Sequence, residues 1–261
     1  FQQGKYDYFG QSHSVFEIFN LSFRRLHGIF WEPGVLAFFA NLFTYLNLFY
    51  LKNTKHSIFG AIIVILTWSS TGIFLLLLQF LWSIYKGYLV VNKNSGKQFY
   101  YLFTLTSLIV VSTLFYQNSQ QKLYSDSSDV GSASQRYYDT LGALNIITDN
   151  PISGVGIDHN IISKEIKESY RSIYLNTSLF PFDFNLIQKD EVKFSNSFLR
   201  LFIVFGVPLA IYILYLVYNQ QFFIKEKKLF FLIFCLTLSF TPLLFLPFCF
   251  TFIISGLKKN K

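Results

Sequence analysis

The residues around position 30 combine side-chain types that bind phosphate groups and transfer protons. The segment reads Arg-Arg-Leu-His-Gly-Ile-Phe-Trp-Glu-Pro-Gly over residues 24–34. Arg24 and Arg25 carry planar guanidinium groups, which suit phosphate oxygens. His27 adds a polar ring, and Glu32, at the edge of an apolar segment, is a candidate general base. The alternative is ordinary anchoring, because basic and aromatic residues commonly flank a membrane helix.

Two further arginines are candidates for binding an anionic substrate. Arg136 lies near the predicted start of a helix in a long polar loop, where backbone N–H groups and a guanidinium together attract anions. The alternative is a solvated surface arginine. Arg200 lies one turn inside an apolar segment. A charged side chain there is costly unless it is paired or reaches the membrane surface.

Three polar residues complete the candidate site. Ser195 and Asn196 directly precede the apolar segment that contains Arg200. Both residue types favour helix N-caps, so capping is the alternative to substrate binding. His159 follows a predicted turn at residues 154–156 and is the second candidate base, although a lone histidine is more often structural.

Metal-binding and nucleotide-binding motifs are absent from the sequence. It contains no Asp-x-Asp, no His-Glu-x-x-His, no Walker phosphate-binding loop and no cluster of Cys and His. We therefore expect neither a metal nor another cofactor. Cys235 and Cys249 both fall in the last apolar segment, so the sequence offers no disulfide framework.

The elements that would position these residues are membrane helices. Hydrophobic residues make up 52% of the 261 residues and charged residues 14%, whereas soluble domains have about 25% charged residues. Breaks are expected at residues 67–72 and at Pro242 and Pro247, because proline interrupts a helix. The sequence thus predicts an all-α integral membrane protein, a polytopic helical bundle with about seven crossings. The predicted crossings are residues 33–51, 57–69, 72–91, 99–116, 196–218, 229–241 and 244–257.

The distribution of charge predicts the orientation of the helices. Short basic segments at residues 52–56, 86–97, 225–228 and 258–261 hold half of the 22 Lys and Arg residues, but only one of the 14 Asp and Glu residues. Positive charge marks cytoplasmic segments, so a nucleic-acid partner is not needed to explain the net charge of +8. The remaining polar segments are then outside the cytoplasm. The expected organisation is an external segment (1–32), about four crossings (33–116), a large external loop (117–194), and about three crossings with a basic tail (195–261).

The external loop is predicted to be partly helical. Residues 132–135 read Ser-Ala-Ser-Gln and fit a capping box. The helix should end at residues 149–151 (Asp-Asn-Pro), before a tight turn at 154–156. A second, weaker helix is expected over residues 163–174, followed by an irregular stretch at 175–194. The predicted apolar face of the first helix consists of Tyr137, Leu141, Leu144 and Ile147.

Four motifs in this order resemble those of the O-antigen polymerase and O-antigen ligase (Wzy-type) family. They are R-x-x-G-x-F-x-E-P-G (25–34), a Ser/Thr-Gly helix break (69–72), S-x-R-Y-x-x-x-x-x-A-L-x-x-I-x-D-x-P-I-x-G-V-G (134–156) and S-N-S-F-L-x-x-x-x-x-F-G (195–206). The resemblance covers essentially the whole chain. It implies the C-terminal half or more of such a protein.

The resemblance implies a metal-independent glycosyltransferase at the outer face of the bacterial cytoplasmic (inner) membrane. Its donor would be an undecaprenyl-diphosphate-linked oligosaccharide, and its partners would be membrane lipid and a chain-length regulator protein. Arg25 and Arg136 fall on the motif arginines that grip the diphosphate. A guanidinium would stabilise the charge of the leaving group, and Glu32 or His159 would serve as the base.

Three functions remain as alternatives: a polymerase, a ligase and a non-enzymatic membrane protein or transporter. Ligases of this family typically have His-Asn where this sequence has Ser195-Asn196, which favours a polymerase. The arginine frequent at the family's helix break is also absent, because Thr71-Gly72 stands there. A transporter should show repeated halves and charged groups at mid-membrane, and neither is visible in this sequence.

Overall fold

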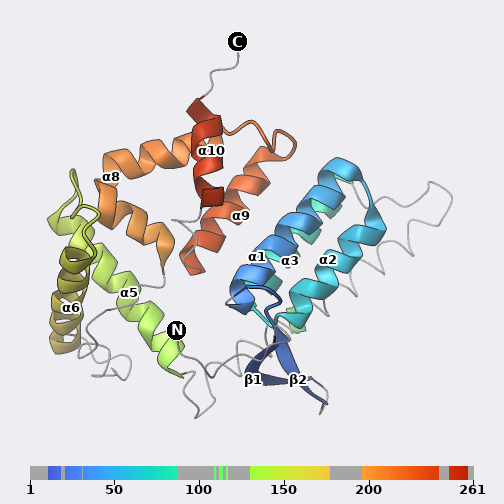
Figure 1. The fold of residues 1–261 in the computed structure, drawn as a ribbon, viewed down its shortest axis with the longest axis horizontal. Helices are drawn as coiled ribbons and strands as arrows, with labels where there is room; N and C mark the ends of the chain where they lie inside the picture. The colour runs from blue at the N-terminus through green and yellow to red at the C-terminus, as the bar shows by residue number, and fades with distance from the viewer. Residues whose placement is uncertain are drawn as a thin grey trace. The chain divides into compact units, whose positions relative to one another are not determined.

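The computed structural model describes residues 11–18, 21–30, 32–87, 109, 112–113, 116, 130–176, 196–240 and 247–257. This part of the chain is mostly helical, with eight α-helices, one π-helix and two short strands (Figure 1). The chain divides into two compact units, Phe1–Gln121 and Lys122–Lys261. The prediction of a helical protein is confirmed in this coarse sense.

The first unit opens with a β-hairpin. Strand β1 (Gln11–Ile18) pairs antiparallel with strand β2 (Leu21–Leu26), and Val15 lies opposite Arg24. Apolar and polar residues alternate at the start of β2, as in Leu-Ser-Phe-Arg, which is typical of a strand. The hairpin is an addition to the predicted all-helical fold, and it carries Arg24 and Arg25.

Three helical segments follow the hairpin. Helix α1 (Pro33–Tyr45) continues directly into the π-helix η1 (Leu46–Leu51), and α2 (Thr54–Leu66) and α3 (Ser70–Tyr85) come next in the described part of the unit. The predicted break at residues 67–72 is confirmed. Trp68 has a φ of 48° there, and Ser69 caps α3 by accepting a hydrogen bond from Gly72 N.

Small and polar side chains hold these helices together. A Cβ added at Gly60 of α2 would lie 2.5 Å from Thr44 Oγ1 of α1, so only glycine permits this approach. The fully buried Asn41 of α1 donates to the carbonyl oxygen of Gly72 on α3 at 3.1 Å, and Gln79 Nε2 of α3 donates to Asn41 Oδ1 at 2.8 Å. Close backbones and buried polar pairs are the means by which helices associate in apolar surroundings.

Among its described residues, the second unit contains five helices. Helices α5 (Val130–Asp149) and α6 (His159–Asn176) form a pair, and α8 (Ser197–Tyr218), α9 (Lys227–Phe240) and α10 (Pro247–Leu257) follow. Two residues of the first half of α8, Ile203 and Val204, belong to the same hydrophobic core as α5 and α6. The beginning of α8 is therefore part of the packed α5–α6 domain. The other buried members of this core are Tyr138, Ala143, Ile146, Ile162, Ile166, Tyr170 and Ile173.

The predicted bounds of the loop helices hold better than the predicted apolar face. Helix α5 ends at Asp149 as predicted, and α6 starts at His159, earlier than expected. Tyr137, Leu141 and Ile147 of that face do pack against the core, but Leu144 is 48% exposed, so its place on the apolar face was wrong. The core instead centres on Tyr138, Ala143 and Ile146, because α5 turns this face toward α6 and α8.

Two of the described helical segments are long and apolar enough to cross a bilayer, judged by length and composition. They are Pro33–Leu51 and Ser197–Tyr218. Helices α2, α3, α9 and α10 match four of the predicted crossings in position, but they are shorter than the roughly 20 residues that a straight crossing needs. The predicted crossing at residues 99–116 lies almost wholly outside the described residues. The count of seven crossings therefore stays a prediction.

Candidate functional site

Arg25 contacts the helix break of the first unit. It lies half-buried on β2, and its Nε donates a hydrogen bond to the carbonyl oxygen of Thr67 at 3.2 Å. Thr67 directly follows α2, where a helix leaves backbone carbonyls without intrahelical donors. A cation near a helix C-terminus is also favoured by the helix dipole. The structure therefore joins the first predicted motif to the helix break at residues 67–72, which contains the second predicted motif.

The other candidates of this motif lie beside Arg25 in sequence but differ in exposure. Arg24 is exposed on β2. His27 is buried, and its Nδ1 donates to Phe30 O at 2.5 Å across a turn in which Gly28 has a φ of 59°. Glu32 is half-buried and is the N-cap residue just before α1, with its backbone carbonyl accepting from the amides of residues 35 and 36.

The candidates in the predicted external loop lie on two helices of the second unit. Arg136 belongs to the first turns of α5, and His159 is the first residue of α6. Neither side chain is among the described ones. Asp158 Oδ1 accepts from Asn160 N at 2.9 Å, so this carboxylate caps α6. Arg25 and Arg136 fall in different units, and their convergence on one ligand stays a prediction.

Asn196 caps α8. Its Oδ1 accepts a hydrogen bond from Leu199 N at 3.0 Å, which is the capping role that its residue type allows. Any contact to a substrate would have to come from its amide nitrogen, Nδ2. Arg200 lies half-buried one turn further along α8. Ser195 is outside the described residues.

Helix α8 is broken in its middle, a feature that was not predicted. Gly206 has φ 72° and ψ 169°, which is not helical, and Pro208 follows. Pro208 has no N–H, so it cannot bond to the carbonyl of Val204. Val207 N bonds to Pro151 O at 2.8 Å instead of Ile203 O. Two carbonyl groups of the first half of α8 thus lack their usual helical donors.

The loop between α5 and α6 supplies the missing donors. Val155 N donates to Ile203 O at 2.8 Å, and Gly156 N donates to Val204 O at 3.1 Å. Figure 1 shows this loop beside the point where the two halves of α8 meet. We call residues 151–156 together with residues 203–207 the glycine clasp. The clasp joins the third predicted motif to the fourth, and the three hydrogen bonds described between the loop and α8 are all between backbone groups.

The clasp requires glycine at two positions. A Cβ added at Gly154 would lie 2.5 Å from Ile203 O, and one added at Gly206 would lie 2.2 Å from Ile152 O. Both residues also have positive φ angles. Gly206 and Pro208 are visible in the sequence as a glycine and a proline within an apolar segment. The sequence does not show that residues 151–156 contact them.

Asp139 and Tyr170 form a buried pair that was also missed. The Tyr170 hydroxyl donates to Asp139 Oδ1, and both side chains are fully buried between α5 and α6. Burial, and then the charge of Asp139 and its hydrogen bond, raise the pKa of Tyr170 far above its ordinary value. Gly142 packs against the Tyr170 ring, where a Cβ would lie 3.0 Å from it. A carboxylate near the apolar face of a helix was the available signal.

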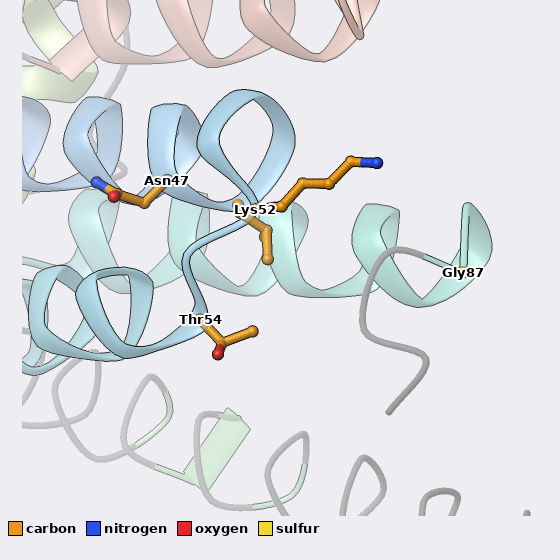
Figure 2. Close-up of a pocket in the computed structure, with 5 residues that line it drawn as sticks. Asn47, Lys52, Thr54 and Gly87 are labelled. Carbon is orange, nitrogen blue, oxygen red and sulfur yellow. The ribbon is translucent and has the colours of Figure 1, made fainter. Parts of the chain in front are cut away.

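A small pocket lies at the opposite end of the first unit from Arg25. Figure 2 shows Lys52 and Thr54 at the turn between η1 and α2, with Asn47 on η1 and Gly87 just after α3. Leu48 completes its lining. None of the candidate residues lines this pocket. Among the described residues, no three His, Cys, Asp or Glu side chains are grouped so that they could hold a metal ion.

Comparisons with protein-family models, curated proteins and solved structures found no match for this chain.

Proposed function

We propose that this chain belongs to a membrane-bound polysaccharide polymerase. It transfers an undecaprenyl-diphosphate-linked glycan onto a lipid-linked repeat unit at the outer face of the bacterial cytoplasmic membrane. The resemblance of its four motifs to the Wzy-type family motivates the proposal. The observation that carries it is that the first motif contacts the helix break beside the second motif, and the third motif contacts the fourth.

Each pair joins a motif with candidate chemistry to a break in an apolar helix. Arg25 binds the carbonyl group at the break after α2. The motif that contains Arg136 ends in the loop that binds the break in α8. Broken helices at membrane depth occur where the backbone is covered by protein or lines a cavity. This arrangement supports a site at the outer membrane boundary, where a lipid diphosphate and a polar glycan both have access.

The chemistry assigns one role to each class of side chain. The acceptor hydroxyl oxygen attacks the anomeric carbon of the donor, and the bond from that carbon to the diphosphate oxygen breaks. The bonding electron pair leaves with the lipid diphosphate, whose negative charge Arg25 and Arg136 stabilise. The hydroxyl proton passes to Glu32 or His159 as the base. Residues that would bind the glycan and the diphosphate further are Arg24, His27, Ser195, Asn196 and Arg200.

Reconstituted protein tests this proposal directly. The full chain is placed in vesicles with a fluorescent undecaprenyl-diphosphate-linked oligosaccharide, and the products are separated by size. We expect lipid-linked glycans of increasing length with the unaltered protein and none with Arg136→Ala. Arg171→Ala is the matched control, because Arg171 is exposed on α6 outside the motifs. Transfer only to added lipid A-core would favour a ligase, and no transfer at all would refute a glycosyltransferase.

A variant of Arg25 needs a separate fold control. Arg25→Ala removes the hydrogen bond to Thr67 O as well as the charge, so lost activity could reflect a disturbed helix break. Arg25→Lys keeps the charge but not the bidentate guanidinium. We expect both variants to lose polymer formation while their melting temperatures stay close to that of the unaltered protein. Activity equal to that of the unaltered protein in Arg25→Ala would contradict the catalytic role.

A further inference from the structure

Three isoleucines lie exposed around the loop between α5 and α6. Ile152 is 78% exposed, Ile157 is 70% exposed, and Ile161, in the first turn of α6, is 45% exposed. Exposed single apolar residues are common, but here three fall within ten residues of the chain, and we call these three residues the isoleucine patch. By contrast, Ile146 and Ile162, on the helices that flank the loop, are buried in the core.

The glycine clasp fixes the level of this patch along α8. Pro151 O accepts from Val207 N, and Gly156 N donates to Val204 O. Ile152 and Ile157 are therefore adjacent to hydrogen-bonded residues that lie at the break in α8. The patch cannot move away from the break without losing these bonds.

Exposed apolar side chains of α8 are confined to the half after the break, which also has buried residues (Ala210, Leu216 and Val217). Before it, Leu201, Ile203 and Val204 are buried. After it, the exposed large apolar residues are Leu209, Ile211, Tyr212 and Tyr215, which are 46–60% exposed. These residues point to more than one side of the helix, since successive residues are about 100° apart around its axis. An apolar helix surface exposed in this way is what a lipid-facing helix presents.

We propose that Ile152, Ile157 and Ile161 form a wedge that inserts into the outer leaflet of the membrane. The clasp holds the loop of the patch at the break in α8, and the exposed apolar residues of α8 begin just past this break, so bilayer lipid is the partner that the patch fits. Exposed Asp149 and Asp158 flank the loop, and charged groups are expelled from hydrocarbon. The wedge therefore lies at the level of the lipid head groups, and the clasp holds it there.

This inference rests on the membrane location in the proposed function, but not on the glycosyl transfer. It adds a lipid contact made by the external domain itself. The α5–α6 domain is then tied to the bilayer twice, through the backbone of α8 and through the isoleucine wedge.

Depth-dependent fluorescence quenching tests the wedge. Cysteine replaces Ile152 or Ile157 in the full chain, with Cys235 and Cys249 changed to alanine, and carries the environment-sensitive dye NBD. The protein is reconstituted in vesicles of phosphatidylethanolamine and phosphatidylglycerol, with or without lipids that bear a nitroxide near the head group. The exposed positions tolerate a label, and melting temperatures verify that each labelled variant is folded.

Dye at two further positions provides the reference values for lipid and for water. Ile211, exposed on the second half of α8, reports a lipid environment, and Thr140, exposed on α5, reports water. We expect nitroxide lipids to quench the dye at 152 and 157 about threefold more than at 140, as for a side chain at the interface. Quenching at 211 but not at 152 and 157 overturns the wedge alone. Absence of quenching at 211 as well overturns the membrane location and the wedge together.

Discussion

Substitution of the glycines in the clasp separates backbone strain from the loss of tertiary contact. Gly154, Gly156 and Gly206 all have positive φ angles, of 63°, 89° and 72°. An added Cβ meets backbone atoms within about 2.5 Å at Gly154 and Gly206, but nothing within 4 Å at Gly156. Alanine at Gly156 therefore adds strain alone, whereas alanine at the other two positions also forces the clasp apart.

The expected free energies follow from these contacts. A non-glycine residue in such a backbone conformation costs about 1–3 kcal/mol. The contacts at Gly154 and Gly206 are with backbone atoms, so relief requires separation of the loop from α8. The clasp has three backbone hydrogen bonds, each contributing about 0.5–1.5 kcal/mol. We expect Gly156→Ala to lower the free energy of unfolding by about 1–3 kcal/mol, and Gly154→Ala and Gly206→Ala by about 3–7 kcal/mol.

Two measurements on purified protein in detergent check these values. Chemical denaturation followed by circular dichroism gives the free energy of unfolding of each variant. Hydrogen exchange gives the protection of the Val155, Gly156 and Val207 amides, which should fall in Gly206→Ala while the α5–α6 interface stays protected. If Gly206→Ala and Gly156→Ala lower the stability equally, the proposed clash and clasp are wrong.

Two further predictions concern buried polar groups, one in each unit. The pKa of Tyr170 is raised in the folded protein above the unfolded value of 10.0, so the folded state holds this proton more tightly. Stability contributed by the neutral phenol is then present below pH 10 and is lost as the pH rises above it. Denaturation between pH 9 and pH 11 should show the free energy of unfolding falling as the pH rises, and Tyr170→Phe should remove this pH dependence. Equal pH dependence in both proteins would contradict the raised pKa of Tyr170. In the first unit, Asn41→Ala should destabilise by about 2–4 kcal/mol, because it breaks hydrogen bonds to Gly72 O and to Gln79. Gln79→Leu should lower the stability less than Asn41→Ala, because no described residue donates to the buried Gln79 Oε1. Thermal melting of the two variants measures this order. A larger loss of stability in Gln79→Leu would contradict the reasoning.

Local sequence signals account for most helix positions. The Thr-Trp-Ser-Ser-Thr-Gly stretch predicted the end of α2 and the start of α3, because Ser69 is a capping residue there. The Asp-Asn-Pro sequence likewise predicted the end of α5 at Asp149. These features depend on residues within one or two turns of each other, which a single sequence displays.

Features that depend on distant partners could not be predicted. Gly206 and Pro208 indicated a weak point in α8, but only the folded chain shows which amides satisfy the freed carbonyl groups. Leu144 fitted the helical period of the predicted apolar face and is nonetheless exposed. Periodicity gives the width of an apolar stripe, whereas the packing of neighbours decides which edge of it is covered.

The same limit applies to the candidate site. Sequence motifs selected Arg25, and the structure adds the carbonyl oxygen of Thr67 as its partner. Asn196 was predicted either to cap α8 or to bind substrate, and its capping bond is confirmed. Asp139 lies near the apolar face of its helix, but Tyr170 is 31 residues away in sequence, so no local signal identified it as the partner.

With the membrane location of the proposed function, the hydrogen bond between Asn41 and Gln79 has a consequence for how the chain would enter the bilayer. Helices α1 and α3 are made separately during synthesis, with α2 between them. Until α3 arrives, the Asn41 side-chain oxygen has no Gln79 amide to accept from, and a lone amide is poorly tolerated among acyl chains. We therefore expect α1 to wait beside the translocation machinery until the α2–α3 hairpin emerges, so that the three helices leave it as a group.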